Sequence, residues 1–294
     1  MNCDSLTVAM RLDGVWNALW GALPVFAASL IATLAVVPVA RAVAHATGVV
    51  DQPDAVRKLH GRTVAYLGGV GVFVGAFVGI VVGAIMSGAA LDALPPVPFS
   101  VVLGMVAITF TGLADDVWKF DARLKVAGQL VAAAALAIDE IGVNVANGIL
   151  VPILGAPRET LFTLGSLTVQ NAQLYYWVGT TLVALFVLGG CNAANLLDGL
   201  DGLLSGISAV MALGLLGLSL LVIFALPPDA TDVNAITQSM AGARVRLCAS
   251  MRGACLGLLL PPAYVPVWGH PQPNAPSWSE VALGGLQPPP VGPA

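Results

Sequence analysis

The chain has 294 residues, of which 57% are hydrophobic and 10% are charged, and its formal net charge is −4 at pH 7. Soluble globular domains are about one-quarter charged, so this composition excludes an ordinary soluble domain. It indicates an all-α polytopic membrane protein. The four cysteines have neither metal-ligand nor redox spacing, and we interpret them as small apolar residues: Cys3, Cys191, Cys248 and Cys255.

Apolar segments of membrane-spanning length predict the helices. A spanning helix needs about 20 mostly apolar residues, and six segments meet or approach that length: 18–40, 64–88, 97–114, 124–138, 174–191 and 203–226. A seventh apolar run, from Leu247 to Leu260, contains Arg252 and is too short for a full span. We therefore expect six to seven transmembrane helices. No cleavable signal peptide is expected, because the first apolar run, near Trp16, lacks a cleavage site.

Basic residues in the connections predict the orientation. The first and third connections carry most of them: Arg41, Arg57, Lys58, Arg62, Lys119, Arg123 and Lys125. The second connection has none and the fourth has only Arg158. The positive-inside rule then places the first, third and fifth connections in the cytoplasm and the N-terminus outside. The fifth connection has no basic residue, so its side follows from counting the spans.

The fourth connection and the end of the chain are less regular. Residues 139–173 alternate β-forming residues with Gly and Pro, which is compatible with a short hairpin or with a plain connecting loop. We divide the chain into a membrane-embedded core at 1–226, a divergent segment at 227–260 with a partial seventh span, and a Pro/Gly-rich tail at 261–294. The composition of the tail predicts disorder.

The first cytoplasmic connection contains a basic cluster. Arg57 and Lys58 could neutralise phosphate oxygens, and His60 follows them. A positive-inside signal without a ligand is the usual interpretation of such a loop. The pair Gly68-Gly69 more often reports close helix packing than a phosphate cradle.

The third connection contains adjacent carboxylates at Asp115 and Asp116. Adjacent carboxylates repel unless a cation lies between them, or unless one takes up a proton, as a general base does. The alternative is that they cap the end of the third span or pair with Lys119. Lys125 and Gln129 follow in the next helical segment.

The fifth connection has the most specific pattern. Asn195, Asp198 and Asp201 lie within seven residues at the end of an apolar run. Carboxylates at a bilayer boundary are costly unless they hold a metal, a partner charge or a substrate. A polar helix cap is the alternative. Together the three connections offer acids and cations on one membrane face, which suits Mg²⁺ and phosphoryl transfer to a lipid acceptor.

At these residues the chain resembles the polyprenyl-phosphate N-acetylhexosamine-1-phosphate transferases, also called glycosyl transferase family 4. The resemblance covers residues 20–226 and three motifs in family order: Asp51-x-Pro53…Arg57-Lys58-x-His60…Gly68-Gly69, then Asp115-Asp116 with Lys119, Lys125 and Gln129, then Asn195-x-x-Asp198-Gly-Leu-Asp201-Gly-Leu. The third motif is the most diagnostic. The first has the form of the GlcNAc-1-phosphate branch.

The resemblance implies attack of a lipid phosphate on the β-phosphorus of a UDP-N-acetylhexosamine, which releases UMP. Asp115 is then the expected base, and Asp116, Asp198 and Asn195 are expected to surround Mg²⁺, or alternatively Mn²⁺, and the diphosphate. The other substrate-binding positions carried over from the motifs are Lys58, His60, Lys119, Lys125, Gly199, Leu200 and Asp201. Asp115, Asp116 and Asp198 form the expected catalytic set.

The implied setting is the inner, or plasma, membrane of a bacterium, with multiple spans and a role in peptidoglycan or other cell-envelope polysaccharide synthesis. The implied partners are the UDP-sugar, undecaprenyl or another polyprenyl phosphate, and the bilayer. A homodimer is compatible with the resemblance, and we expect no nucleic-acid partner.

The chain departs from the family pattern after the sixth span. Family members continue with further spans, a Met-Gly-Asp-x-Gly-Ser segment whose Asp binds the metal, and a His/Arg-rich loop that selects the sugar, and this sequence has neither of these two features. We expect the departure between residues 227 and 260, through a frameshift, a truncated gene or a degenerate paralogue. A non-catalytic membrane protein that retains nucleotide or lipid-phosphate binding is therefore the alternative to the transferase. A small transporter is disfavoured, because the acids gather at one membrane face rather than at the midplane.

Overall fold

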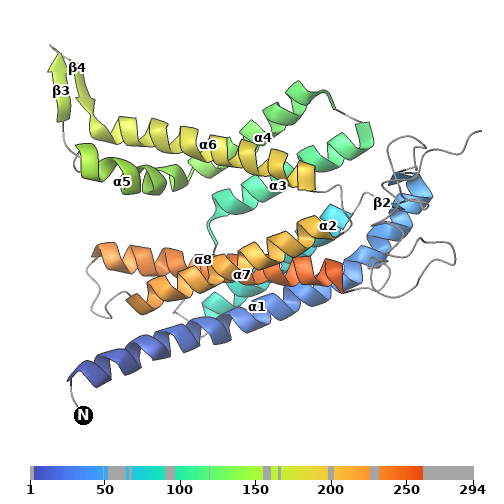
Figure 1. Ribbon diagram of the computed structural model, residues 1–294, viewed down its shortest axis with the longest axis horizontal. Coiled ribbons are helices and arrows are strands. Elements are labelled where there is room, and N and C mark those ends of the chain that lie inside the picture. Colours follow the sequence, from blue (N-terminus) through green and yellow to red (C-terminus); the bar gives the residue numbers. More distant parts are fainter. Residues whose placement is uncertain are drawn as a thin grey trace, which may run out of the picture.

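The computed structural model describes residues 3–48, 50–51, 64–65, 68–89, 97–118, 120–154, 160–164, 167–197, 202–225 and 232–260. Within them the chain is almost entirely helical, as expected (Figure 1). The helices are α1 (Cys3–Thr47), α2 (Gly68–Ala89), α3 (Phe99–Trp118), α4 (Ala122–Ala137), α5 (Ile141–Leu154), α6 (Asn171–Leu197), α7 (Leu203–Ala225) and α8 (Asp232–Leu259).

Two short antiparallel hairpins complete the described structure. Strand β1 (Val50–Asp51) pairs with β2 (Val64–Ala65) between α1 and α2. Strand β3 (Thr160–Leu164) pairs with β4 (Leu167–Gln170) between α5 and α6. The predicted fourth connection, residues 139–173, is therefore a hairpin only in its second half. Ile141–Leu154 form helix α5, which the alternation of β-forming residues with Gly and Pro did not predict.

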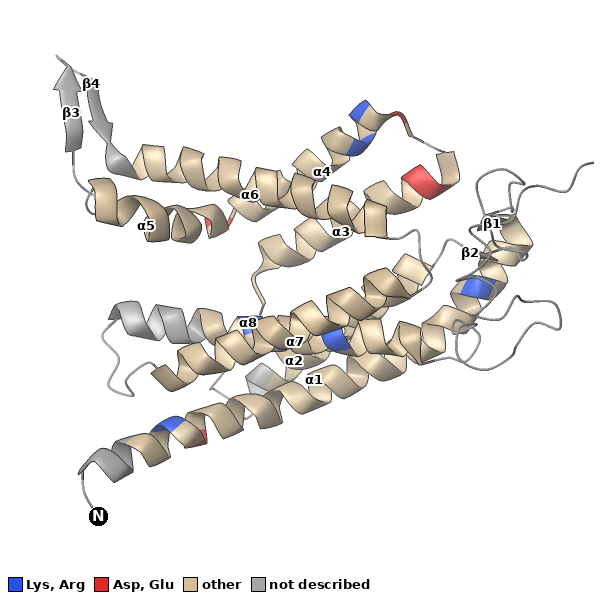
Figure 2. Cartoon of the chain, viewed as in Figure 1, with Lys and Arg blue, Asp and Glu red and all other residues tan. Residues whose placement is uncertain are grey.

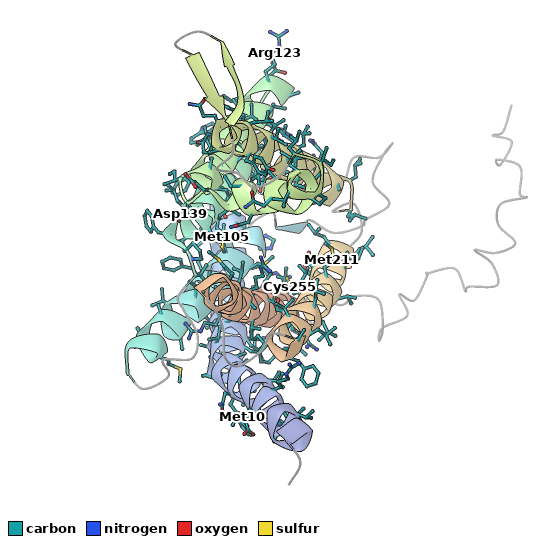
Figure 3. The ribbon with its side chains drawn as sticks, turned by 90° about the vertical axis from the view of Figure 1, so that its left-hand side faces the viewer. Met10, Met105, Arg123, Asp139, Met211 and Cys255 are labelled. Atoms are coloured by element: carbon teal, nitrogen blue, oxygen red, sulfur yellow. The ribbon has the colours of Figure 1, made fainter. Side chains whose placement is uncertain are left out.

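The helices pack as two groups (Figures 1 and 3). Helices α1, α2, α7 and α8 form one group, and α3, α4, α5 and α6 form the other, with few contacts between α2 and α3 or between α6 and α7. The core of the first group is made of small and β-branched side chains: Ala18, Ala22, Val25, Ile223, Ala241, Val245 and Ala249. Small side chains let helix backbones approach closely, which is how helices associate where burial from water does not drive packing.

Ser29, Gly79 and Ser250 lie where α1, α2 and α8 pack closely against one another. A Cβ atom on Gly79 would lie 2.8 Å from Ser250 Cβ, a distance that real Cβ atoms essentially never show, and 3.0 Å from Ser29 Cβ, which is tight. The Ser29 hydroxyl donates a hydrogen bond to the Ser250 carbonyl across the same contact. Glycine is therefore required in α2 at this crossing.

Five of the described helices are long and apolar enough to cross a membrane, or six if the bent pair α4–α5 counts as one span. The bend between α4 and α5 is 78°. Asp139 lies at this corner, and its Oδ2 accepts a hydrogen bond from the Ser100 backbone N–H, 3.2 Å away, in the first turn of α3 (Figure 3). The corner is thereby attached to the beginning of α3.

Helix α8 is longer than the apolar run Leu247–Leu260 that suggested it. The helix begins at Asp232 and packs against α1, α2 and α7, although it is not among the helices apolar enough to count as spans. Ala241 and Val245 are completely buried in these contacts. The predicted disordered tail, residues 261–294, lies outside the described residues.

Candidate active site

An ion pair joins the two helices around the predicted third connection. Lys125 Nζ lies 2.7 Å from Asp115 Oδ2, and the Phe120 backbone N–H donates to Asp115 Oδ1 at 3.0 Å. Both oxygens of this carboxylate therefore have partners. Asp115 lies in the last turn of α3, where the helix dipole disfavours negative charge, and the Lys125 ammonium offsets that cost.

The local sequence explains why the hairpin turns here. The Asp121 side chain accepts a hydrogen bond from the Ala122 N–H at 2.8 Å, and Asp121 has extended backbone angles, so it forms the N-cap of α4. The rings of Trp118 and Phe120 stack with centroids 6.2 Å apart. The cap and the stacked rings hold Phe120 where its N–H reaches Asp115.

The register of the hairpin brings Lys125 opposite Asp115. Lower in the pair, a Cβ on Gly128 would come within 2.9 Å of Thr111 Cβ, so α3 and α4 touch at that level. Asp115 lies one helical turn beyond Thr111, and Lys125 lies about one turn before Gly128. Because α3 and α4 are antiparallel, the close packing of Gly128 against Thr111 brings Lys125 next to Asp115.

Of the interpretations given for Asp115 and Asp116, the structure supports an ion pair at Asp115. Asp115 is paired with a cation, Lys125, and Lys119, the partner considered from the sequence, lies outside the described residues. Asp116 is half-buried in the same helical turn. Two contacts were not foreseen, the Phe120 N–H and the Asp121 cap. The Asp before the helical run that starts at Ala122 is the only sequence signal for them.

The third motif begins at the end of α6. Asn195 is exposed in the last turn of α6, and α6 packs against α4. The predicted site residues of the other motif positions lie outside the described residues. They are Lys58 and His60 of the first motif, Lys119 of the second, and Asp198, Gly199, Leu200 and Asp201 of the third. Of the predicted site residues, the structure therefore places Asp115, Asp116, Lys125 and Asn195.

The three connections point to the same end of the molecule. In Figure 1 the C-terminal end of α1, the α3–α4 turn and the α6–α7 junction all lie toward the right-hand end. The acidic turn of α3 and the basic turn of α4 lie beside each other at this end (Figure 2). The β3–β4 hairpin lies at the opposite end.

The donor chemistry fits a hard cation. Within the described residues, His, Cys, Asp and Glu side chains form no group of three placed to hold a metal ion. Asp116 and Asn195 carry the carboxylate and amide oxygens that Mg²⁺ prefers, and the oxygens of Asp115 contact Lys125 and the Phe120 N–H.

Comparison with known proteins identifies the family of this chain. The family model described as Glycosyl transferase family 4 matches residues 98–261, which is more than half of the chain. The chain belongs to glycosyl transferase family 4. The match runs from the residue before α3 through α8, so it includes Asp115, Asp116, Lys125 and Asn195, and also the segment 227–260 that the sequence predicted to be divergent.

One curated relative has a named activity. The probable undecaprenyl-phosphate N-acetylglucosaminyl 1-phosphate transferase of Bacillus subtilis (strain 168) is 31% identical over 175 residues, which are 59% of this chain and 41% of the relative. The match thus covers about two fifths of that protein. The apolar helices and this membrane-enzyme relative together indicate a multi-pass membrane protein.

Proposed function

We propose that this chain transfers an N-acetylhexosamine 1-phosphate from a UDP-sugar to a polyprenyl phosphate and releases UMP. GlcNAc 1-phosphate is the proposed group, because the relative from Bacillus subtilis carries that activity in its name. The observation that carries the proposal is the Asp115–Lys125 pair at the end of a membrane-length helix, inside the family match.

In the proposed reaction, Asp115 and Lys125 have separate roles. An oxygen of the acceptor phosphate attacks the β-phosphorus of the UDP-sugar, the bond from that phosphorus to the bridging oxygen breaks, and UMP leaves. Asp115 takes the proton of the acceptor phosphate. Lys125 holds the Asp115 carboxylate in place in the resting site and turns to the phosphate charge as the substrates enter.

A divalent cation fits the remaining acceptors. Asp116, Asn195 and Asp198 are the proposed residues around Mg²⁺, with Mn²⁺ as a substitute, since oxygen donors suit both ions. Bound there, the ion would neutralise the charge that develops on the diphosphate. The residues proposed to contact the nucleotide, sugar and phosphates are Lys58, His60, Lys119, Gly199, Leu200 and Asp201.

We further propose that the site faces the cytoplasm at a bacterial plasma membrane, within cell-envelope polysaccharide synthesis. The support is the concentration of basic residues in and beside the connections predicted to be cytoplasmic, including Arg41, Arg123 and Lys125. Blue turns of α1 and α4 lie at the site end in Figure 2. A polyprenyl phosphate presents its head group at the membrane surface, where the ends of α3 and α4 lie.

The test is UMP release by the purified chain in nanodiscs supplied with UDP-GlcNAc, undecaprenyl phosphate and Mg²⁺. The proposal predicts release that requires both the lipid phosphate and the metal. Because the match spans about two fifths of its relative, a non-catalytic binding protein is the second candidate. UDP-GlcNAc binding without UMP release would support that candidate and overturn the transferase.

A further inference from the structure

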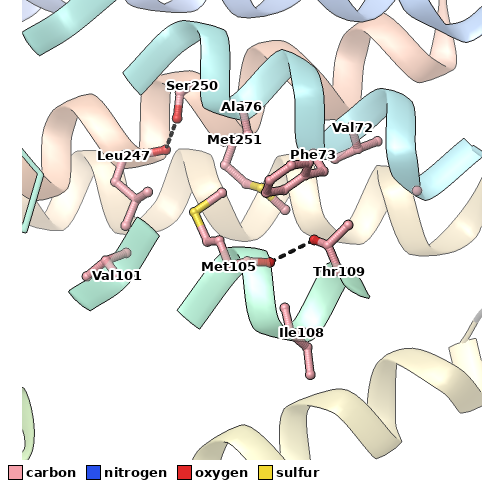
Figure 4. Close-up of a pocket in the computed structure, with 11 residues that line it drawn as sticks. Val72, Phe73, Ala76, Val101, Met105, Ile108, Thr109, Leu247, Ser250 and Met251 are labelled. Atoms are coloured by element: carbon pink, nitrogen blue, oxygen red, sulfur yellow. Dashed lines mark hydrogen bonds between the residues drawn. The ribbon is translucent and has the colours of Figure 1, made fainter. Parts of the chain in front are cut away.

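An apolar cavity of about 350 Å³ lies between α2, α3 and α8, where the two helix groups meet (Figure 4). Phe73 and Ala76 of α2, Met105 of α3 and Met251 of α8 form much of its wall. Its size is within the range of small-ligand sites, about 300–1,000 Å³.

The hydroxyl groups in the wall are already used. Thr109 Oγ1 donates to the Met105 carbonyl at 2.8 Å, and Ser250 Oγ donates to the Leu247 carbonyl at 2.9 Å (Figure 4). A buried water needs two to four polar partners, which this wall does not offer among its described side chains. An empty cavity would forfeit the dispersion contacts of its lining. Hydrocarbon is therefore the favoured content.

The membrane supplies hydrocarbon at this position. Helices α2 and α3 are both long and apolar enough to span a bilayer, and only 11% of the most apolar window of α3 is buried within the protein. Phe99, Leu103 and Phe110 of α3 are exposed. In a membrane these side chains contact acyl chains, so the cavity beside α3 adjoins a surface that lipid already covers.

We propose that this cavity binds one acyl chain of a bilayer phospholipid, packed between α2 and α8 on one side and α3 on the other. The wall extends from Gly69 to Ala76 on α2 and from Val101 to Thr109 on α3, lengths of about 10 and 12 Å along the helix axes. This elongated shape suits a chain segment rather than a compact ligand. Met105 and Met251 are flexible enough to follow its contour.

The bound chain connects the two helix groups near the candidate site. Thr109 is six residues before Asp115, which places the cavity about 9 Å from that carboxylate along α3. The lipid substitutes for protein contacts that α2 and α3 lack, and so holds α3 in place. This role does not depend on the proposed transferase activity.

Photo-crosslinking of the full chain tests the proposal. The chain is placed in phosphatidylcholine nanodiscs that contain a phosphatidylcholine with a diazirine in one acyl chain, and adducts are mapped by mass spectrometry. We expect adducts on Phe73, Met105 and Met251. Met105→Trp fills the cavity and should reduce the adducts on α2 and α8 to background, whereas Leu103→Trp, on the exposed side of α3, should leave them unchanged.

Val101→Trp fills the cavity from the other end of the α3 wall and gives the same test if Met105→Trp does not fold. Equal adducts in the filled and control variants would overturn the proposal, as would adducts confined to exposed residues. A second arm uses a diazirine-bearing polyprenyl phosphate. Labelling of the cavity by that probe alone would assign the cavity to the isoprenoid chain and contradict the phospholipid.

Discussion

The Lys125 ammonium lies 2.7 Å from the Asp115 carboxylate and connects the end of α3 to the beginning of α4. The pair is partly exposed, with 36% of the Lys125 side chain and 23% of the Asp115 side chain accessible to solvent. Its contribution to stability is therefore modest, about 0–1 kcal/mol. Its larger consequence is chemical, because it fixes the position of the carboxylate at the end of α3.

The first prediction separates these two consequences. Lys125→Met should lower the thermal unfolding midpoint in detergent only slightly, because the ion pair is partly exposed, while it should strongly reduce UMP release. Lys125→Arg should restore part of the activity, since guanidinium can also pair with a carboxylate. Arg123→Met, at an exposed position in the same turn, is the matched control and should change neither quantity. An unchanged rate in Lys125→Met would contradict the role of the pair.

The second prediction concerns the crossing of α1, α2 and α8. Gly79→Leu should prevent the close approach to Ser29 and Ser250 and destabilise the chain by about 1–3 kcal/mol, as overpacking does. The unfolding midpoint and the yield of monodisperse protein measure this effect. Gly214→Leu, in α7 with no described heavy atom within 4 Å of the added Cβ, should behave like the wild type. Equal losses in both variants would mean that this contact is not specific.

The third prediction concerns the bent pair. Asp139→Ala removes the acceptor for the Ser100 N–H at the start of α3 and should destabilise the chain by about 1 kcal/mol, as loss of a helix cap does. Asp139→Asn keeps an acceptor oxygen and should retain most of the stability. Hydrogen exchange of the first turn of α3 is the direct measurement. Identical exchange in Asp139→Ala and the wild type would show that the corner does not hold α3.

The fourth prediction tests the orientation. The beginning of α4, which contains Arg123, and the β3–β4 hairpin, which contains Thr168, lie at opposite ends of the molecule (Figure 1), and we replace each of these two residues with Cys. A membrane-impermeant maleimide should label Arg123→Cys only in inverted vesicles and Thr168→Cys only in right-side-out vesicles. The background is a variant with its native cysteines replaced. Labelling of both cysteines from one side would refute the predicted topology.

Apolarity located most of the membrane helices but not their ends, and it missed α5, which lies inside the predicted fourth connection. The predicted segments 97–114 and 124–138 correspond closely to α3 and α4. Helix α1, in contrast, begins well before the predicted segment at 18–40 and continues beyond it. Charged residues such as Arg11 end a hydrophobic window without ending a helix, and the Arg11 guanidinium is accommodated by the Phe224 carbonyl at the end of α7.

Tertiary packing decided the features that the sequence left open. Helix α8 has a moderate apolar content, and burial of Ala241, Val245 and Ala249 against α1 and α7 holds it in place. The partner of Asp115 depends on the register of α3 against α4, and this register cannot be predicted from the sequence pattern. The motifs nevertheless predicted the family, which the match over residues 98–261 confirms.

The central claim is that Asp115 accepts the proton of the acceptor phosphate, and one comparison tests it directly. UMP release is measured for the wild type, Asp115→Asn and Asp121→Asn under identical lipid and Mg²⁺ concentrations. Asp121→Asn preserves a good helix cap in the same turn and should be active. Asp115→Asn should lose about 10²–10⁴-fold in rate, the usual contribution of a general base. Comparable rates in Asp115→Asn and the wild type would contradict the claim.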